Sequence, residues 1–237
     1  MLKKYGIFII SYKRADIINT YKLLPPDSYK VIIRESELED YKAHKIPNLL
    51  PVKDELIDDA LKCCLYPKDY LNSKHYIVLD DDITSFYDRS SGFESLTPDE
   101  VIERMLKIIS IQDDLRIGYG GTLPPRHSKT GKQGFVFNEC SGAIKFINSD
   151  YIKAKLDKNL NDFQDIDFVC QELLHNRVVL INGFFVCDSA PMISTKGGDN
   201  DKSLDDICSQ LIYLKNKWRK YVVAKNHILM ANISVPR

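Results

Sequence analysis

Short apolar runs alternate with helical patterns along most of the chain. Runs typical of buried strands cover residues 6–10, 29–33, 76–79, 115–119 and 143–147, and residues 178–187 read as a strand pair or one long strand. Helical spacing of apolar positions covers residues 15–24, 53–65, 162–176 and 203–223. Because strands alternate with helices, the pattern predicts an α/β fold with a mostly parallel sheet covered by helices on both faces.

One helix start is especially clear. Thr97-Pro98-Asp99-Glu100 places a threonine at the N-cap, a proline at the first helical position and a glutamate that closes a capping box. Residues 120–134 contain four glycines, two prolines and no acidic residue, which indicates a functional or disordered loop rather than a plain connection. No repeat or linker divides the 237 residues, so we expect one domain over residues 1–237.

Composition narrows the class of protein. Hydrophobic residues make up 44% and charged residues 28%, which excludes a disordered chain, a collagen-like fibre and a disulfide-framework miniprotein. The six cysteines show no CxxC spacing, so we expect free thiols in a reducing compartment rather than a zinc site. No stretch approaches the roughly 18 apolar residues of a membrane helix, and the start has no signal-peptide core. The sequence therefore predicts a cytoplasmic protein that does not use a membrane.

The formal net charge is zero, but the charges are unevenly placed. Residues 80–103 carry eight acids and one base, residues 115–138 carry four bases and no acid, and residues 207–237 carry six bases and no acid. Solvated helix faces would explain this distribution. An acidic metal site flanked by basic segments that serve a phosphate-rich substrate would explain it equally well.

The most informative segment is the acidic triplet Asp80-Asp81-Asp82. It follows the apolar run at residues 76–79 directly, and ligands of open α/β sheets bind at the carboxyl ends of strands. Mg²⁺ and Mn²⁺ prefer oxygen ligands, commonly one or two carboxylates together with substrate phosphates. We therefore predict that Asp80 and Asp82 hold a divalent cation. The plainer alternative is an acidic turn that caps the next element.

The placing of these motifs resembles a known family. Ser11-Tyr12-Lys13-Arg14 after the first strand and Asp80-Asp81-Asp82 after a later one, a DxD motif, resemble the GT-A nucleotide-sugar glycosyltransferases. Two further motifs, the run from Glu35 to Tyr41 and Lys196-Gly197-Gly198, are closest to the phage enzymes of the TET-associated type, which glycosylate modified DNA bases. The resemblance implies a GT-A fold with a nucleotide-sugar half over residues 1–90 and an acceptor half over residues 91–237, ending in a basic helix.

The resemblance also implies an activity. The chain would be a glycosyltransferase that depends on Mn²⁺ or Mg²⁺ and moves a sugar from a nucleotide sugar, such as a UDP-sugar, to a hydroxyl acceptor. The acceptor would be a hydroxymethylated pyrimidine in phage DNA, such as hydroxymethylcytosine, and the enzyme would then work in the host cytoplasm.

The resemblance assigns the donor site to Ser11, Tyr12, Arg14, Glu35, Lys53, Asp81, Lys196, Gly197 and Gly198. Tyr12 can stack on a base, Arg14 can contact a phosphate, and the two glycine amides can cradle a phosphate. Lys53-Asp54 stands where relatives carry Arg-Asn, so Lys53 would meet the diphosphate as a point charge without a bidentate fork. The plainer readings are a strand-to-helix turn with a surface arginine and an ordinary glycine turn.

The acceptor side is predicted in the same way. Asp165 stands where many GT-A enzymes have an acid that removes the proton of the acceptor hydroxyl. Asp162 and Asp167 suit the same helix N-terminus, and any of the three acids could be there for the helix dipole alone. The further candidates are Ser141 and Gly142 for the acceptor pocket, Trp218 for acceptor contact or helix packing, and Asp188 as a metal ligand or a surface acid.

Other functions stay open at this point. A polysaccharide or protein glycosyltransferase would share the donor site and use a different acceptor. A catalytically silent GT-A-like binding module would keep the fold without the reaction. A metal-dependent nucleotidyltransferase also uses paired carboxylates.

Overall fold

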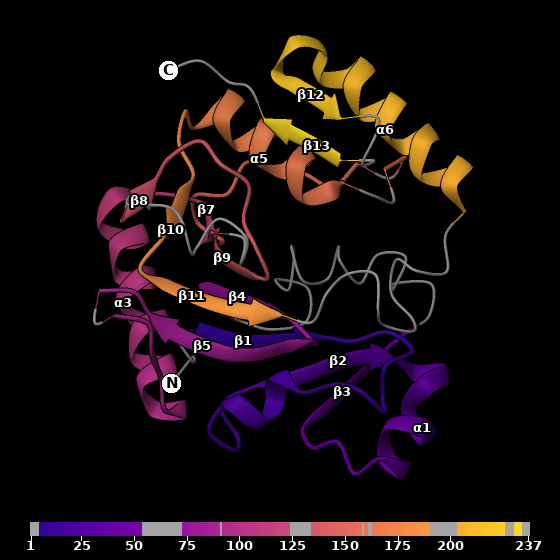
Figure 1. The fold of residues 1–237 in the computed structure, drawn as a ribbon, viewed down its shortest axis with the longest axis vertical. Helices are drawn as coiled ribbons and strands as arrows, with labels where there is room; N and C mark the ends of the chain where they lie inside the picture. The colour runs from indigo at the N-terminus through magenta and orange to yellow at the C-terminus, as the bar shows by residue number, and fades with distance from the viewer. Residues whose placement is uncertain are drawn as a thin grey trace.

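An eight-stranded sheet runs through the middle of the molecule (Figure 1). The computed structural model describes residues 5–53, 73–90, 92–123, 134–157, 159–160, 163–189, 203–225 and 230–233. In spatial order the strands are β3 (Leu49–Val52), β2 (Lys30–Arg34), β1 (Tyr5–Ile10), β4 (His75–Asp80), β9 (Ile144–Asn148), β7 (Tyr119–Thr122), β10 (Leu180–Asn182) and β8 (Phe135–Val136).

Most strands of this sheet run in one direction. The pairs β3–β2, β2–β1, β1–β4 and β7–β10 are parallel, whereas β9 is antiparallel to both β4 and β7, and β8 is antiparallel to β10. The predicted class, an α/β fold with a mostly parallel, Rossmann-like sheet, is confirmed. The antiparallel β9 in the centre was not predicted, and it adds a strand that enters the functional edge from the opposite direction.

Side chains alternate between two cores because successive strand residues point to opposite faces. On one face Ile9 belongs to a cluster with Met105 of α3 (Pro98–Leu115). On the other face Phe8 belongs to a cluster with Phe168 of α5 (Gln164–His175). The sheet is thus covered by a helix on each face, as the strand–helix alternation predicts.

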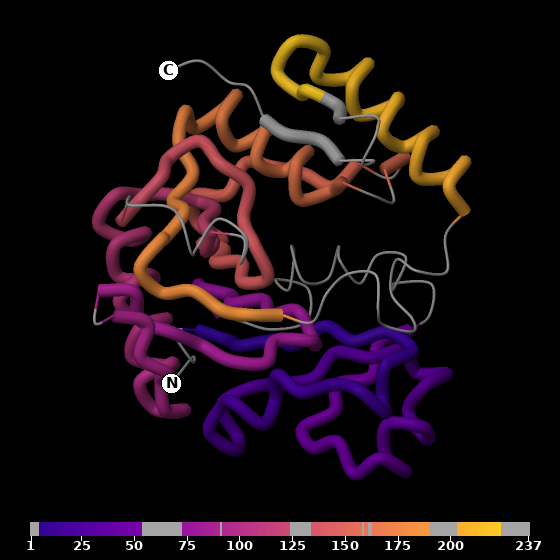
Figure 2. The backbone as a smooth tube through the Cα atoms, viewed as in Figure 1, coloured from indigo at the N-terminus to yellow at the C-terminus, as the bar shows by residue number. Residues whose placement is uncertain are grey.

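Smaller elements complete the two sides. A second sheet of β11 (Phe185–Ser189), β5 (Ile83–Asp88) and β6 (Glu94–Ser95) packs on the α3 side, where the rings of Phe86 and Phe185 stack with centroids 5.6 Å apart. On the other side α6 (Leu204–Trp218), η6 (Arg219–Tyr221) and the hairpin β12 (Val222–Lys225)–β13 (Met230–Ile233) lie beyond α5 (Figures 1 and 2). Leu211 and Leu214 of α6 pack there against Ile166 and Cys170 of α5.

Several elements follow the sequence prediction closely. Strands β1, β2, β4 and β9 and helix α5 coincide with predicted runs to within two residues, and residues 178–187 form two strands, β10 and β11, in different sheets. Helix α3 begins as predicted, because Thr97 accepts from the amide of Glu100 and the Glu100 carboxylate accepts from the amide of Thr97.

Three predicted elements are wrong in part. Residues 15–24 form turns and the short η1 (Thr20–Leu23), because the amides of Asn19 and Thr20 donate to the carbonyl of Asp81 instead of continuing a helix. The strand expected at 115–119 begins at Tyr119, since α3 runs to Leu115 and Arg116 caps it in the left-handed conformation. The last helix ends at Trp218 rather than at residue 223, and the chain continues into η6 and β12.

Other elements have no counterpart in the prediction. They are η2 (Glu35–Glu37), α1 (Leu38–Ala43), β3, β5, β6, β8, β12 and β13. The helix predicted over residues 53–65 lies outside the described residues except for Lys53, and so does most of the loop predicted over 120–134. Among the described helices, none has the length and apolar character needed to cross a membrane.

The start of β4 gives a prediction about pH. His75 is buried, and its Nε2 lies 3.0 Å from Oδ2 of Asp113. Burial lowers the pKa of His75, although the hydrogen bond to Asp113 opposes this effect. The unfolded chain therefore takes up a proton on His75 more readily than the folded chain, so this residue's contribution to the free energy of unfolding falls as the pH drops below about 6.5.

We expect His75→Gln to flatten the decrease in the free energy of unfolding between about pH 7 and pH 5. Urea unfolding at a series of pH values measures this directly. The matched control is His44→Gln, because His44 is exposed at the end of α1. An equally steep decrease in His75→Gln and in the unchanged chain would contradict the prediction.

Candidate functional site

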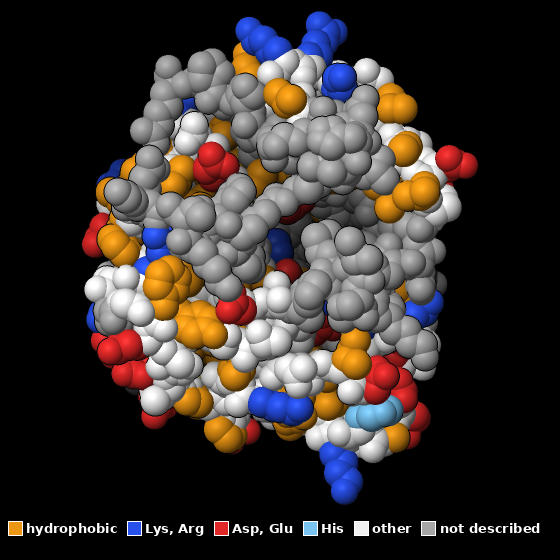
Figure 3. Space-filling model, viewed as in Figure 1, with side chains coloured by type: hydrophobic (Ala, Val, Ile, Leu, Met, Phe, Trp, Pro, Cys, Tyr) orange, Lys and Arg blue, Asp and Glu red, His pale blue; other side chains and the backbone are white. Residues whose placement is uncertain are grey.

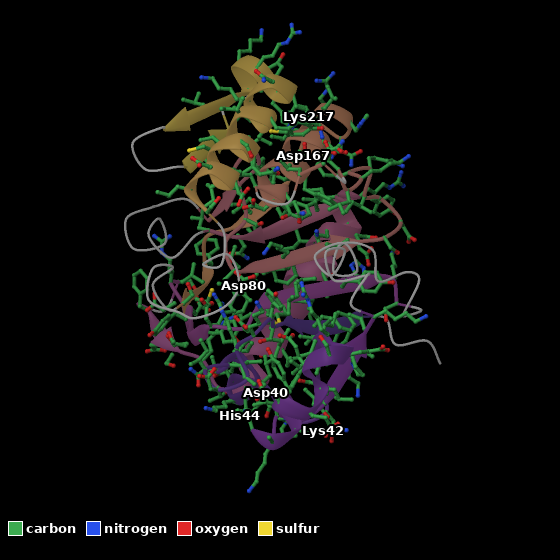
Figure 4. All side chains as sticks on the ribbon, turned by 90° about the vertical axis from the view of Figure 1, so that its right-hand side faces the viewer. Asp40, Lys42, His44, Asp80, Asp167 and Lys217 are labelled. Atoms are coloured by element: carbon green, nitrogen blue, oxygen red, sulfur yellow. The ribbon has the colours of Figure 1, made fainter. Side chains whose placement is uncertain are left out.

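The candidate site lies where the carboxyl ends of β1 and β4 face the first turn of α5. Because β1, β2 and β4 are parallel, Ser11, Arg34 and Asp80 come to the same edge of the sheet. Figure 3 shows a hollow in this part of the surface, with basic and acidic side chains on its floor. Figure 4 shows Asp80 near mid-height, between the layer of β1 to β4 and the layer of α5 and α6.

Asp81 is the buried centre of the N-terminal part of the site. Its side chain accepts a hydrogen bond from Ser11 Oγ at 2.5 Å and one from Arg14 Nη1 at 2.8 Å, one on each carboxylate oxygen. Tyr41 of α1 donates in turn to Ser11 Oγ at 2.7 Å. Burial raises the pKa of Asp81, and the contacts with Ser11 and Arg14 oppose that rise. Asp81 therefore fixes the loop after β1, and its predicted contact with the donor stays a prediction.

Arg14 and Tyr12, which both follow β1, contact different groups. The Arg14 guanidinium lies 3.8 Å from Oδ2 of Asp82 as well as 2.8 Å from Asp81, so it balances two of the three acids. The Tyr12 ring lies 3.9 Å from the guanidinium carbon of Arg34, a cation–π contact that links the ends of β1 and β2. An aromatic–arginine platform of this kind can stack a planar ring, which is the role predicted for Tyr12.

Asp80 and Asp82 are the acids that can reach a ligand. The Asp80 side chain is 44% exposed and the Asp82 side chain 18%, whereas Asp81 is almost fully buried. Burial raises the pKa of Asp82 to about 6, and the charges of Asp80 and Asp81 add to the rise. A carboxylate such as Asp82, whose ionised form is disfavoured by neighbouring carboxylates, fits a divalent cation, which would remove the repulsion.

Asp188, the third predicted metal ligand, is connected to this pair through a shared neighbour, Cys187. It belongs to β11, opposite Ser85 of β5, and burial together with the charges of Asp80, Asp188 and Asp82 raises the pKa of the buried Cys187 thiol. Within the described ranges, however, no group of three or more His, Cys, Asp or Glu side chains is arranged to hold a metal ion. A cation at Asp80 and Asp82 would therefore take its further oxygen ligands from water or from the substrate, as is usual for Mg²⁺. The metal prediction stays a prediction.

Lys145 is a site residue that the sequence analysis missed. It lies on β9, opposite Val78 of β4 and Gly121 of β7, and its Nζ is 3.3 Å from Oδ1 of Asp80. Burial favours the neutral amine, but the negative charges of Asp80 and Asp165 outweigh it and raise the pKa of Lys145. The only sequence signal is a lysine inside the apolar run 143–147, at a position that points into the molecule.

The structure separates the three acids proposed as the base. Asp162 lies outside the described residues. Asp167 is buried and accepts from Trp218 Nε1 at 2.7 Å, from Gln171 Nε2 at 2.7 Å and from Lys217 at 2.8 Å. Figure 4 places Asp167 and Lys217 together, away from Asp80.

Asp165 is therefore the described acid of this helix turn that reaches the site. It is half-buried, burial raises its pKa, and the charge of Lys145 opposes the rise. Trp218 serves to pack α6 against α5, which was the plainer of its two readings.

Ser141 and Gly142 form part of the wall between β7 and β9. Ser141 is buried and its Oγ lies 2.7 Å from the Tyr119 hydroxyl, while the Gly142 amide donates to the Thr122 carbonyl. A side chain on Gly121 would collide with Cβ of Ser141, so this glycine allows the close approach. Tyr119, Ser141, Lys145 and Asp165 thus make a polar group beside Asp80.

The remaining predicted residues are placed as follows. Glu35 is exposed on η2, and it is Glu37 that contacts the loop after β1, accepting from the Lys13 amide at 2.8 Å. Lys53 is exposed just after β3. Lys196, Gly197 and Gly198 lie outside the described residues.

The basic C-terminal segment has both paired and exposed side chains. Lys217 forms ion pairs with Asp157 and Asp167. Lys215, Arg219 and Lys220 are exposed near the end of α6, where Figure 3 shows basic side chains at the top of the molecule.

Comparison with known proteins adds no argument about this chain. No model of a protein family matches the sequence, and the search of curated proteins finds no match. One similar solved structure is the CMP:2-keto-3-deoxy-manno-octonic acid synthetase complexed with CTP, with a TM-score of 0.45 and 12% sequence identity over 90% of this chain and 100% of that chain. A likeness of this degree carries no argument about function.

The different surroundings of Asp81 and Asp82 give a prediction about stability. Asp81→Asn leaves the partly buried Arg14 without its main counter-charge, so we expect the free energy of unfolding to fall by about 3 kcal/mol. Asp82→Asn removes a like charge from the triplet, so we expect no loss and a gain of up to about 1 kcal/mol. Urea unfolding at neutral pH measures both, and an equal loss in the two variants would contradict the assignment.

Proposed function

We propose that this chain is a metal-dependent glycosyltransferase of the GT-A type, which moves a sugar from a nucleoside-diphosphate sugar to a hydroxyl acceptor. The observation that carries the proposal is the placing of two carboxylates, Asp80 and Asp82, at the carboxyl end of β4, with Lys145 paired to Asp80 and near enough to Asp165 for their charges to act on each other. Asp80 and Asp82 would then bind the cation beside the leaving diphosphate, and Asp165 would act on the acceptor hydroxyl.

The donor would lie against the ends of β1, β2 and β4. Asp80 and Asp82, with Asp188 as a further candidate, would hold Mn²⁺ or Mg²⁺, and the bound cation would neutralise the diphosphate as it leaves. Tyr12 and Arg34 offer the planar platform for the nucleotide base, and Arg14 is held ready beside Asp81 to meet a phosphate. Glu35, Lys53 and the segment Lys196-Gly197-Gly198 are donor contacts by resemblance alone.

The acceptor would enter from the side of α5. Its hydroxyl oxygen forms the new bond to the anomeric carbon, the bond from that carbon to the diphosphate oxygen breaks, and Asp165 takes the hydroxyl proton. Ser141, Gly142 and Tyr119 would border the acceptor. We propose a hydroxymethylated pyrimidine in DNA, which would have to be flipped out of the duplex to reach Asp165. The exposed side chains of Lys215, Arg219 and Lys220 near the end of α6 support contact with a phosphate backbone.

One observation favours a second candidate, a catalytically silent module of the same fold. Three adjacent carboxylates without a cation would destabilise a fold, but Arg14 and Lys145 already supply positive charge to them, at 2.8 Å from Asp81 and 3.3 Å from Asp80. A chain with this internal compensation can stay folded without any metal. The two candidates differ in whether a divalent cation and a nucleotide bind together.

Ligand-dependent thermal stability tests the donor site. We expect one nucleoside-diphosphate sugar with Mn²⁺ to raise the melting temperature of the unchanged chain by several degrees, because a ligand that binds only the folded state stabilises it. The shift should disappear with EDTA and in the double variant Asp80→Ala/Asp82→Ala. No shift with any nucleotide sugar and Mn²⁺ would favour the silent module.

Sugar transfer tests the acceptor and the base. With the donor identified by thermal shift, we expect transfer to DNA that contains hydroxymethylcytosine and none to the same DNA with plain cytosine. Asp165→Asn should reduce transfer at least about 100-fold at unchanged donor binding. Asp167→Asn is the matched control: it should lower stability through the loss of its contacts with Lys217 and Trp218, with less effect on transfer per folded molecule.

Two outcomes would contradict this assignment. Transfer to a polysaccharide or a protein in place of DNA would overturn the proposed acceptor and leave the transferase. Full transfer activity in Asp165→Asn would remove Asp165 from the reaction.

A further inference from the structure

We propose that Lys145 is a positioning residue that competes with the divalent cation for Asp80 and pairs with Asp165 once the cation displaces it. The inference rests on the proposed function, since it concerns the same two groups of acids. It links the two groups of acids. Whether a cation is bound at Asp80 would decide whether Lys145 pairs with Asp80 or with Asp165.

The geometry of Lys145 supports this role. Its side chain is 12% exposed, its Nζ lies 3.3 Å from Oδ1 of Asp80, and the charge of Asp165 also acts on it. Asp80 and Asp165 also act on each other as like charges. A buried ammonium between two carboxylates keeps both in place, and removing it would leave the two acids in mutual repulsion.

Competition follows from the charges. Asp80 is the partner of Lys145 and is also one of the two proposed ligands of the cation. A divalent cation and an ammonium beside the same carboxylate repel each other, so binding the first weakens the contact of the second. The lysine is anchored by β9 and has Asp165 within the reach of its charge, which gives it a second partner without leaving the site.

The antiparallel direction of β9 places Lys145 beside the carboxyl end of β4. Because β9 runs antiparallel to β4, Lys145 stands opposite Val78, two residues before Asp80 and on the same face of the sheet as Asp80. The exchange that we propose is then a change of the Lys145 rotamer on a strand whose position is fixed by its pairing with β4 and β7.

Mn²⁺ binding without any nucleotide tests the proposal. In the full chain titrated with Mn²⁺ alone, with free Mn²⁺ followed by its paramagnetic resonance signal, we expect Lys145→Met to bind about tenfold more tightly than the unchanged chain. Lys145→Arg keeps the charge and should stay within about twofold of the unchanged chain. The matched control is Lys107→Met, which removes a lysine paired with Glu103 on the surface of α3 and should not alter Mn²⁺ binding.

A double-variant cycle tests the second half of the proposal. Asp165→Asn removes the alternative partner of Lys145, so the lysine should stay on Asp80 and Mn²⁺ should bind about threefold more weakly. In the Lys145→Met background the same Asp165→Asn change should have no such effect. A direct attraction between Asp165 and the cation would weaken binding equally in both backgrounds, which would overturn the exchange.

The outcomes separate this inference from the proposed function. Unchanged or weaker Mn²⁺ binding in Lys145→Met, with normal binding in the unchanged chain, overturns the competition and leaves the metal-dependent transferase. Absence of Mn²⁺ binding in both overturns the metal dependence and the competition together. Circular dichroism of each variant confirms that it is folded, and Lys145→Gln replaces Lys145→Met if the latter is not.

Discussion

The need to balance three consecutive carboxylates at the end of β4 shapes the whole candidate site. Asp80, Asp81 and Asp82 lie together at the carboxyl end of the buried strand β4, and the negative charge of each is compensated in a different way. Asp81 is neutralised from within by Arg14, Asp80 is paired with Lys145, and Asp82 keeps a pKa raised to about 6. The fold thus fixes one acid completely and leaves the other two able to change partner.

This division of roles depends on elements that are far apart in the chain. The loop after β1 supplies Arg14 and Ser11, α1 supplies Tyr41 to hold Ser11, and β9 supplies Lys145. A chain of hydrogen bonds from Tyr41 through Ser11 to Asp81 therefore connects the packing of α1 with the position of Arg14. The stability of α1 and the position of the Arg14 guanidinium therefore depend on the same contacts.

The sequence locates the acidic triplet at the end of a strand, as the structure has it, but does not predict its surroundings. Asp80 and Asp82 could be found because a buried strand followed by acids is a local pattern that places them at a sheet edge. Lys145 could not, because its contact with Asp80 spans 65 residues and depends on an antiparallel strand inserted between β4 and β7. The helix expected over residues 15–24 failed for a related reason: a distant carbonyl, that of Asp81, takes the amides that a helix would use.

The acids of α5 show the same limit of local pattern. Asp165 and Asp167 are equivalent in sequence, since both suit the positive end of the helix dipole. Tertiary contacts separate them, because Lys217 and Trp218 of α6 occupy Asp167 and leave Asp165 facing Lys145. Helix α6 therefore distinguishes two acids that the sequence leaves equivalent, because its Lys217 and Trp218 hold Asp167 in the contact between α5 and α6.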